Sequence, residues 1–564
     1  MTEHKIKLTS TPGYKVIKKW LNDRSRKPFA FQQETWESII NSESGLVNAP
    51  TGFGKTYSVF LGAIIQFIND NPADYLTTKN SGLQLLWVTP LRALAKDIAR
   101  AMEEVIGELG MQWRIGSRNG DTPISERQKQ KRSMPEVLII TPESLHLFLA
   151  QKDYAATFRH LKIIAVDEWH ELIGSKRGVQ VELAISRIVN LNKGKGKREN
   201  PEADFIQHST FNIQNNSPQV WGISATIGNL EEAKNVLLSP LRKEGIIIKA
   251  RVKKKFRIES VIPEEIEKYP WAGHLGIKLA DKVIPIVEAN KTTLIFINTR
   301  GMSETWYQTL LTVAPDLAGV VALHHGSIER ELRTWVEEAL HEGILKVVVC
   351  TASLDLGVDF RPVDTVIQVG SPKGVARFLQ RAGRSGHQPD AVSTIYFLPT
   401  HSLELVEAAA LKEAIEEQFT ESRLPLVLCF DVLVQYLCTL AVSDGFYPDE
   451  IFEEIRSTYC FSEINESEWK QLLQFITVGG IALQQYDDFK KVEINEDGCY
   501  KINSRRIAMR HRMHIGTIVS DAMLKVKFLS GGYRRDRRIF YCKAETGDVF
   551  TLAGRNRNSS LSKT

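Results

Sequence analysis

Short apolar segments recur along the first 400 or so residues of the chain and alternate with amphipathic stretches. Each segment ends in a turn or polar residue, which is typical of a parallel strand covered by helices on both faces of its sheet. The expected strands form two groups: Leu83–Val88, Val137–Ile140, Ile163–Val166 and Trp221–Ser224, then Leu294–Ile297, Val320–Leu323, Lys346–Cys350, Thr365–Val369 and Ser393–Leu398. The pattern therefore predicts two α/β lobes in tandem.

At 564 residues the chain is too long for one hydrophobic core, and its length corresponds to roughly three or four domains. A dense basic cluster within Arg242–Glu265 marks the expected boundary between the lobes. Helical patterns then follow at Leu426–Leu440, Pro448–Ser457 and Glu466–Val478. With the β-like pieces at Ile481–Tyr486 and Tyr500–Ile502, they predict a winged helix. We expect lobes at 1–245 and 246–405, a winged-helix-like domain at 406–512 and a partial β-rich module at 513–564.

Composition excludes several classes of protein. Hydrophobic residues make up 43% of the chain and charged residues 25%, as in globular proteins. The longest apolar run, Tyr57–Ile68, is shorter than the ~18 residues of a membrane span, and the first residues lack the features of a signal peptide. The six cysteines include no C-x-x-C pair, which argues against a zinc site or a disulfide framework. A cytoplasmic protein with reduced thiols is expected.

Positive charge is concentrated at the end of the chain. The net charge is +5, yet residues 501–564 alone hold 15 Lys and Arg against 4 Asp and Glu. This basic region is a candidate for phosphate contacts, and a solvated tail is the alternative.

The string A-P-T-G-F-G-K-T, Ala49–Thr56, lies between the strand-like Gly45–Asn48 and an apolar helical stretch. In a phosphate-binding loop, glycines such as Gly52 and Gly54 turn backbone N–H groups inward. Lys55 would then reach the β- and γ-phosphates, and Thr56 would offer a hydroxyl to Mg²⁺. The order of strand, loop and helix predicts that the chain binds ATP with Mg²⁺.

Acidic residues follow the expected strand Ile163–Val166. Asp167 would hold Mg²⁺ through water, and Glu168 would orient and deprotonate the attacking water. Ser224 and Thr226 end another strand, where their hydroxyls could bridge toward His170. A helix-capping role for Thr226 is the alternative.

The string Q-R-A-G-R-S-G-H, Gln380–His387, places Arg381 and Arg384 on a Gly-rich turn far in sequence from the phosphate loop. Arginines there fit a site that closes between the lobes, where they stabilise transition-state charge on the γ-phosphate. A simple basic surface turn is the alternative.

Together these motifs resemble those of superfamily-two helicases, most closely the large helicase-related and ligase-associated DEXH-box proteins. The most distinctive string is D-E-W-H-E-L-I-G-S-K-R-G-V-Q, Asp167–Gln180. The resemblance implies two RecA-like lobes followed by the winged helix and the β-module. The string P-F-A-F-Q, Pro28–Gln32, resembles the Q motif, which implies that Gln32 contacts adenine.

Other strings resemble the segments with which this family tracks along a strand: T-P-L-R-A-L-A, S-R-N-G-D-T and T-P-E-S-L in the first lobe, and F-I-N-T-R, H-H-G-S and T-A-S-L-D-L-G-V-D-F in the second. The residues implied to bind nucleic acid are Thr89, Arg92, Thr141, Thr299, Arg300 and Thr351. In the last string, Asp359 is implied to serve the nucleotide site, and Gln380 joins the catalytic set.

The resemblance implies an ATP-dependent DNA helicase or single-strand translocase that moves 3′-to-5′ and serves DNA repair, with repair enzymes as partners. Two alternatives stay open. An RNA remodeller is one, because nothing in these motifs reads the 2′-OH. The other is a nucleic-acid scaffold that binds ATP with little turnover.

The chain departs from the superfamily pattern at two places. His387 stands where a second arginine is common, so we expect Arg384 to be the main arginine finger and Arg381 to pair with the region of Glu168. Near the C-terminus, Arg534–Thr546 does not fit the family pattern. We expect the strand partners of Gly516–Phe528 to be missing and the tail from about Arg534 to be poorly packed, through true truncation or through compensating frameshifts.

Overall fold

A computed structural model describes most of the chain. The described residues are 5–50, 52–191, 217–225, 227–251, 255–262, 275–355, 363–386, 392–479 and 491–516, together with four short strands after residue 516. Within these ranges, no helix has both the length and the apolar character needed to cross a bilayer. Several expectations fall outside them, namely the surroundings of Thr226, Asp359 and His387 and the expected strand Ile481–Tyr486.

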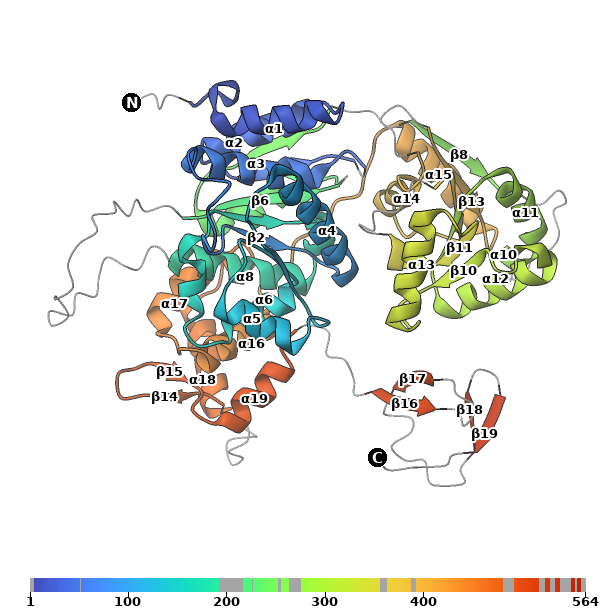
Figure 1. The fold of residues 1–564 in the computed structure, drawn as a ribbon. Coiled ribbons are helices and arrows are strands. Elements are labelled where there is room, and N and C mark those ends of the chain that lie inside the picture. Colours follow the sequence, from blue (N-terminus) through green and yellow to red (C-terminus); the bar gives the residue numbers. More distant parts are fainter. Residues whose placement is uncertain are drawn as a thin grey trace. The chain divides into compact units, whose positions relative to one another are not determined.

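The first lobe is built on a seven-stranded parallel sheet with the order β3-β4-β2-β5-β6-β1-β7 (Figure 1). Its strands are β1 (Gly45–Asn48), β2 (Leu85–Val88), β3 (Ile115–Arg118), β4 (Val137–Ile140), β5 (Ile163–Val166), β6 (Gln219–Ser224) and β7 (Ile246–Lys249). Alternate residues of one strand enter different cores: Leu138 joins one apolar cluster and Ile139 the other. Both faces are thus covered, as the continuous apolar runs predicted.

Helices from the segments before and between the strands cover these two faces. Those with residues in the cluster of Ile139 are α1 (Pro12–Asp23), α2 (Ala30–Ile40), α3 (Lys55–Asp70) and α4 (Arg92–Leu109), and those with residues in the cluster of Leu138 are α6 (Pro142–Leu149), α8 (Lys176–Leu191) and α9 (Leu230–Leu238). The short helices α5 (Ile124–Arg132) and α7 (Trp169–Leu172) complete the lobe. Because β7 pairs with β1, the lobe includes Lys249, and the expected boundary at residue 245 was too early.

The second lobe has a six-stranded parallel sheet with the order β10-β11-β9-β12-β13-β8. The strands are β8 (Phe256–Ser260), β9 (Thr293–Ile297), β10 (Val321–His324), β11 (Val347–Cys350), β12 (Thr365–Val369) and β13 (Ser393–Leu398). The helices are α10 (Leu275–Lys278), α11 (Ala280–Ala289), α12 (Arg300–Val313), α13 (Arg330–Glu342), α14 (Val375–Ala382) and α15 (Leu403–Glu416). Ala408 and Leu411 of α15 are buried in this lobe's core, so the lobe extends past the expected boundary at residue 405.

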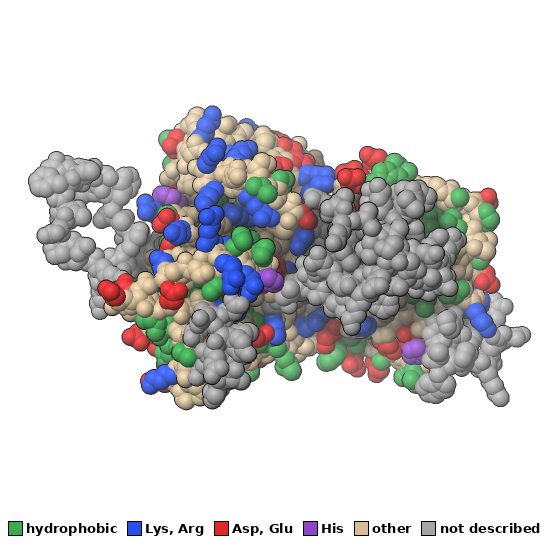
Figure 2. Space-filling model, turned by 90° about the horizontal axis from the view of Figure 1, so that it is seen from below, with side chains coloured by type: hydrophobic (Ala, Val, Ile, Leu, Met, Phe, Trp, Pro, Cys, Tyr) green, Lys and Arg blue, Asp and Glu red, His purple; other side chains and the backbone are tan. Residues whose placement is uncertain are grey.

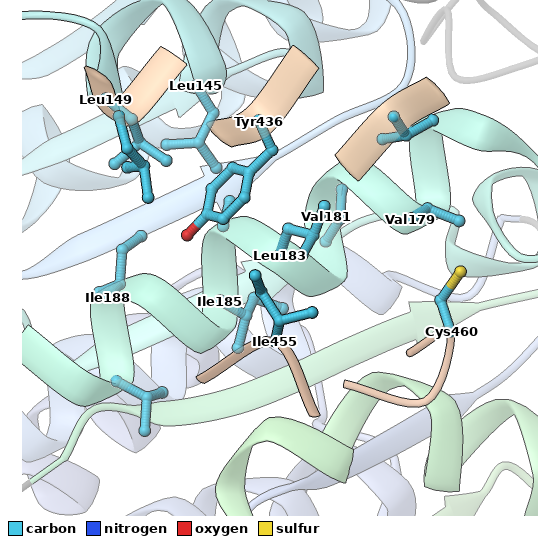
Figure 3. Close-up of a cluster of buried hydrophobic side chains, with 14 of the residues drawn as sticks. Leu145, Leu149, Val179, Val181, Leu183, Ile185, Ile188, Tyr436, Ile455 and Cys460 are labelled. Carbon is cyan, nitrogen blue, oxygen red and sulfur yellow. The ribbon is translucent and has the colours of Figure 1, made fainter. Parts of the chain in front are cut away.

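The winged-helix region comprises α16 (Phe430–Val442), α17 (Pro448–Arg456), α18 (Glu466–Val478), the paired strands β14 (Glu493–Ile494) and β15 (Tyr500–Lys501), and α19 (Arg505–Met513). Its first helices share one hydrophobic core with the first lobe. Figure 3 shows Tyr436 and Ile455 close to Leu145 of α6 and to Leu183 and Ile185 of α8. Tyr436 is 1% exposed, so this contact is as dry as a domain interior. The region is therefore anchored on the first lobe.

Residues 516–564 form a second compact unit. In it, β16 (Met523–Lys527) pairs antiparallel with β17 (Tyr533–Arg537), and β18 (Val549–Leu552) pairs with β19 (Arg555–Asn558). The prediction that β16 lacks a partner strand is wrong. Strand pairing uses backbone groups, so a run of arginines can still form a ladder. Most of the rest of the mismatched stretch lies outside the described residues.

Candidate functional site: a nucleotide site and a nucleic-acid edge

The phosphate-binding loop joins β1 to α3, as its sequence predicts. Gly52 and Gly54 have φ values of +90° and +69°, in the left-handed region that favours glycine. Gly54 directly precedes α3, and Lys55 and Thr56 begin the helix. The first N–H groups of a helix, here those of Lys55 and Thr56, have no acceptor one turn earlier in the helix and lie at the positive end of the helix dipole. The loop thus has the backbone geometry of a phosphate site.

Gln32 lies on α2 and supports this loop. Its Nε2 donates to the carbonyl of Gly54 at 3.0 Å, and its Oε1 accepts from the N–H of Phe29 at 2.9 Å. A Cβ at Gly54 would lie 3.0 Å from the same Nε2, which leaves little room for a side chain there. Gln32 is therefore part of the loop's framework, and its contact with adenine stays a prediction.

Two carboxylates follow β5 and lie beside Lys55. The Oε2 of Glu168 is 3.7 Å from the Nζ of Lys55. Both atoms are buried without a hydrogen-bond partner. Glu168 has a φ of +46°, a conformation that costs a non-glycine residue about 1–2 kcal/mol and is tolerated mainly at functional sites. Two unsatisfied charged atoms at the head of α3 fit a phosphate oxygen and a water that the bound nucleotide would bring.

The two carboxyl groups have different electrostatics. Burial, and then the charge of Glu168, raises the pKa of Asp167. Burial would also raise the pKa of Glu168, but the positive charges of Lys55 and Arg384 hold it below its ordinary value. Glu168 is thus kept ionised, as a general base must be. A cation beside Asp167 would stabilise its charged form, so Thr56 and Asp167 suit Mg²⁺.

His170 of α7 connects the lobes. Its Nδ1 accepts from the N–H of Ala225 at 3.2 Å, and its Nε2 lies 2.9 Å from the amide of Gln380 on α14. Burial lowers its pKa to about 4, so the ring is neutral at pH 7. The structure places Nε2 of Gln380 at this 2.9 Å distance. Because a neutral ring that accepts at Nδ1 carries its proton on Nε2, the chemically consistent assignment turns the Gln380 amide so that its oxygen accepts from the ring.

The expected link from Ser224 to His170 is not made by the hydroxyl. Ser224 Oγ donates to the carbonyl of Ala225 at 2.9 Å, and the neighbouring N–H of Ala225 contacts the ring instead. The hydroxyl is turned away because β6 ends at Ser224 and the chain bends at Ala225.

The two arginines have different surroundings. Arg381 donates to both carboxylate oxygens of Asp355 at 2.7 and 2.9 Å and to Gln368 at 2.6 Å. The prediction that Arg381 pairs with the region of Glu168 is therefore wrong. Arg384 donates to the backbone carbonyl of Asp355 at 3.0 Å, and its charge lowers the pKa of Glu168. Of the two arginines, Arg384 is the one whose charge is felt by Glu168.

Sequence reasoning missed Asp355, which is 4% exposed. It lies in T-A-S-L-D-L-G-V-D-F, and the signal was an acidic residue four positions after Thr351 with no assigned partner. Its bidentate pairing with Arg381 fixes α14 within the second lobe.

The candidate nucleic-acid residues lie where strands end and helices begin. Thr89 follows β2, Thr141 caps α6 and Thr351 follows β11, while Arg300 begins α12 next to its cap Thr299. The carboxyl ends of parallel strands meet at one edge of a sheet, so each lobe presents its set along one edge. Arg92 begins α4, and its exposed guanidinium pairs with Asp121 at 3.0 Å.

Three family models match the chain. DEAD/DEAH box helicase matches residues 29–233, helicase conserved C-terminal domain matches 277–388, and the winged helix domain of the large helicase-related protein matches 413–560. The last match includes β16 to β19, so one family module covers both C-terminal regions that we separated at residue 512.

Among curated relatives, ATP-dependent helicase Lhr-Core protein 2 of Thermococcus barophilus is 31% identical over 92% of this chain and 59% of its own length. Lhr helicase/uracil glycosylase of Escherichia coli is 30% identical over 78% of this chain and 30% of its own. Among solved structures, helicase Lhr of Mycobacterium smegmatis bound to ssDNA and AMP-PNP has 26% identity and a TM-score of 0.76, over 91% of this chain and 63% of that one. The chain thus spans less than two thirds of these relatives.

Proposed function

Because the chain belongs to the superfamily-two DEXH-box helicases of the large helicase-related kind, we propose that it hydrolyses ATP to move along single-stranded DNA. The observation that carries the proposal is the 2.9 Å contact between His170 and Gln380. It brings α14, the helix that leads to Arg384, against α7 of the other lobe, and the charge of Arg384 reaches Glu168. A nucleotide held there would be contacted from both lobes.

The residues of the nucleotide site would have separate roles in ATP hydrolysis. The first turn of α3 and Lys55 would bind the phosphates, and Glu168 would accept a proton from the attacking water. Arg384 would stabilise charge that develops on the γ-phosphate. Thr56 and Asp167 would hold Mg²⁺, which neutralises phosphate charge when bound. Closure and reopening of the cleft would then shift the grip of the threonine-rich edges along the strand.

DNA is the proposed track because the Mycobacterium smegmatis helicase Lhr is described as bound to ssDNA. Movement in the 3′-to-5′ direction, a role in DNA repair, repair proteins as partners and a cytoplasmic location rest on the family resemblance and composition, and they stay predictions. An RNA remodeller is the second candidate, since a sugar-phosphate grip does not by itself read the 2′-OH.

The deciding experiment measures phosphate release with ATP and Mg²⁺ alone, with single-stranded DNA and with RNA of the same sequence. We expect strong stimulation by DNA. Stimulation by RNA alone would favour the remodeller, and no stimulation by either would favour an ATP-binding scaffold. Duplexes with a 3′ or a 5′ single-stranded tail then test direction, and only the 3′-tailed duplex should be unwound.

The basic helix α19 is expected to contact phosphates rather than base edges. Arg505, Arg506 and Arg510 are exposed, and Figure 2, which views the molecule from the side on which α19 lies in Figure 1, shows Lys and Arg side chains over this face. Neutralising these three to Gln should weaken binding to every DNA sequence. It should also reduce the salt slope, which is the slope of the logarithm of the binding constant against the logarithm of the salt concentration. The expected reduction is about 2, because each phosphate contact on a single strand contributes ~0.7.

Arg512, on the same helix, provides the control. Its guanidinium donates to the carbonyl of Ala150 at 3.0 and 3.2 Å and to that of Val442 at 3.3 Å. Arg512→Gln should therefore lower the melting temperature and leave the salt slope nearly unchanged. If the salt slope of the triple variant equals that of the wild-type protein, α19 does not contact phosphates and is an ordinary solvated surface.

A further inference from the structure

The segment between α15 and α16 lies against three glycines that belong to other parts of the fold. A Cβ at Gly228, beyond β6, would lie 2.4 Å from the carbonyl oxygen of Thr420. A Cβ at Gly174, after α7, would lie 2.7 Å from the carbonyl of Leu424, and one at Gly374, before α14, would lie 2.3 Å from Glu421 Oε1. Real Cβ atoms do not approach backbone atoms so closely, so residues 420–424 fit only because Gly228 and Gly174 lack side chains, whereas a Cβ at Gly374 would require the end of the Glu421 side chain to move.

Hydrogen bonds hold this segment to the first lobe. The N–H of Gly228 donates to the carbonyl of Glu421 at 3.2 Å. The side chain of Asn229 accepts from the N–H of Arg423 at 2.9 Å and donates to the carbonyl of Arg423 at 3.0 Å. This reciprocal pair imitates a strand ladder, and it fixes the backbone regardless of the side chain at 423.

The same segment reaches the second lobe through one carboxylate. The oxygens of Glu421 accept from the N–H of Ala376 at 3.1 and 3.2 Å. Ala376 is in the first turn of α14, where amides have no intrahelical acceptor and a negative charge is favoured by the helix dipole. Glu421 thus caps the helix that carries Gln380 and ends just before Arg384.

A charge from the segment also reaches the DEXH region. Burial raises the pKa of Glu171 on α7, and the positive charges of Arg423 and of Arg377 on α14 oppose that shift. The carboxyl group therefore lies in the field of cations from both the segment and the second lobe. Glu168 and Asp355 are the acidic groups that act on it in the opposite sense.

We propose that residues 420–424 form an interlobe strap, in which Glu421 and Arg423 are positioning residues for the ATPase site and not catalytic residues. The strap is the covalent path to α16, and it is bonded to both lobes at once. Separation of the lobes must break either the cap on α14 or the clamp at Asn229. The strap therefore stabilises the arrangement in which the two lobes are closed. Because the strap leads directly into α16, opening of the lobes would also move the start of the winged-helix region. This inference rests on the proposed function, since it assumes that closure serves ATP hydrolysis.

Steady-state kinetics test the strap. Glu421→Ala should lower the DNA-stimulated kcat about tenfold, the effect of losing a charged hydrogen-bond acceptor, and leave KM for ATP within about twofold because the phosphate loop is untouched. Glu421→Gln keeps an acceptor oxygen and should retain most of the activity. Glu417→Ala removes an exposed carboxylate four residues earlier and serves as the matched control.

Gly228→Ala provides a second route, because its Cβ would push against the backbone of Thr420 from the first-lobe side. It should reproduce the loss of kcat without removing any polar group. A wild-type kcat in both variants would overturn the strap, as would a loss that Glu421→Gln does not rescue.

Hydrogen exchange gives a readout that does not depend on turnover. In the wild-type protein, the amides of Ala376 and Arg423 should exchange more slowly when AMP-PNP and an oligothymidylate are added. In Glu421→Ala, Ala376 should exchange about tenfold faster, since its acceptor is gone, and Arg423 should lose the added protection. If the wild-type protein shows no DNA-stimulated hydrolysis, the proposed function fails. The hydrogen-exchange comparison then tests by itself whether Glu421 holds the strap to α14. Identical exchange in wild type and variant would then refute it.

Discussion

Lys55→Ala and Glu168→Gln are both expected to abolish ATP hydrolysis, and only the second variant should still bind ATP. Lys55 begins α3 and points its ammonium at the buried carboxylate 3.7 Å away, where a phosphate would lie. Its loss removes ground-state binding of the phosphates. Glu168→Gln keeps the shape of the side chain but cannot accept the proton of the attacking water, so it stops the chemical step. Phosphate release, paired with equilibrium binding of a fluorescent ATP analogue, separates the two effects.

Folding controls are needed because the two residues are paired in a buried place. Lys55→Ala leaves Glu168 buried without its nearest cation, so some loss of thermal stability is expected. Lys55→Met fills the space with an apolar side chain and should be the better-folded partner variant. Robust turnover by Lys55→Ala or by Glu168→Gln would mean that the assigned site is not where hydrolysis occurs.

Central strands were predictable from the sequence because both of their faces are buried. The expected segments Val137–Ile140, Ile163–Val166, Thr365–Val369 and Ser393–Leu398 coincide with strands of the structure. Two edge strands, β3 and β8, were missed for the opposite reason. β3 alternates partly buried and buried positions at one edge of its sheet, and β8 is half-exposed at the edge of the other. Their sequences, I-G-S-R and F-R-I-E-S, lack the continuous apolar pattern of a central strand.

The helix α19 was missed because its arginines dominated the interpretation of its sequence. A local signal was present: Ser504 accepts a hydrogen bond from the N–H of Ile507, as an N-cap residue does. Ala508 is buried and Ile507 packs against the large core, so the helix has a short apolar face. A cap followed by such a face predicts a helix despite the charge.

The phosphate loop and the acidic pair could be predicted because each is local in sequence. Partners brought together by the fold could not. The pairing of Arg381 with Asp355 joins residues on different elements of the second lobe, and nothing in either motif indicates it. The shared core of Tyr436 with the first lobe is a similar case, since an apolar helix face does not specify which surface covers it.

The difference between the two arginines leads to the second large effect. Arg384→Ala is expected to lower kcat by a factor on the order of 10³, the low end of an arginine-finger effect. Arg384 is 3% exposed, and its charge lowers the pKa of Glu168, the proposed general base. Because this charge acts mainly on the transition state, KM for ATP should change little. Arg384→Lys keeps the charge without the planar fork and should recover only part of the rate.

Two comparison variants distinguish this finger from its neighbours. Arg381→Ala leaves Asp355 buried without its bidentate partner, so it should lower stability by about 3–5 kcal/mol, and its loss of activity should follow unfolding. Arg384→Ala should instead keep a melting temperature close to that of the wild-type protein. His387→Ala, at the position where a second arginine is common in the superfamily, should cost far less activity than Arg384→Ala. Equal losses of kcat in the His387 and Arg384 variants would show that Arg384 is not the single residue that stabilises the transition-state charge.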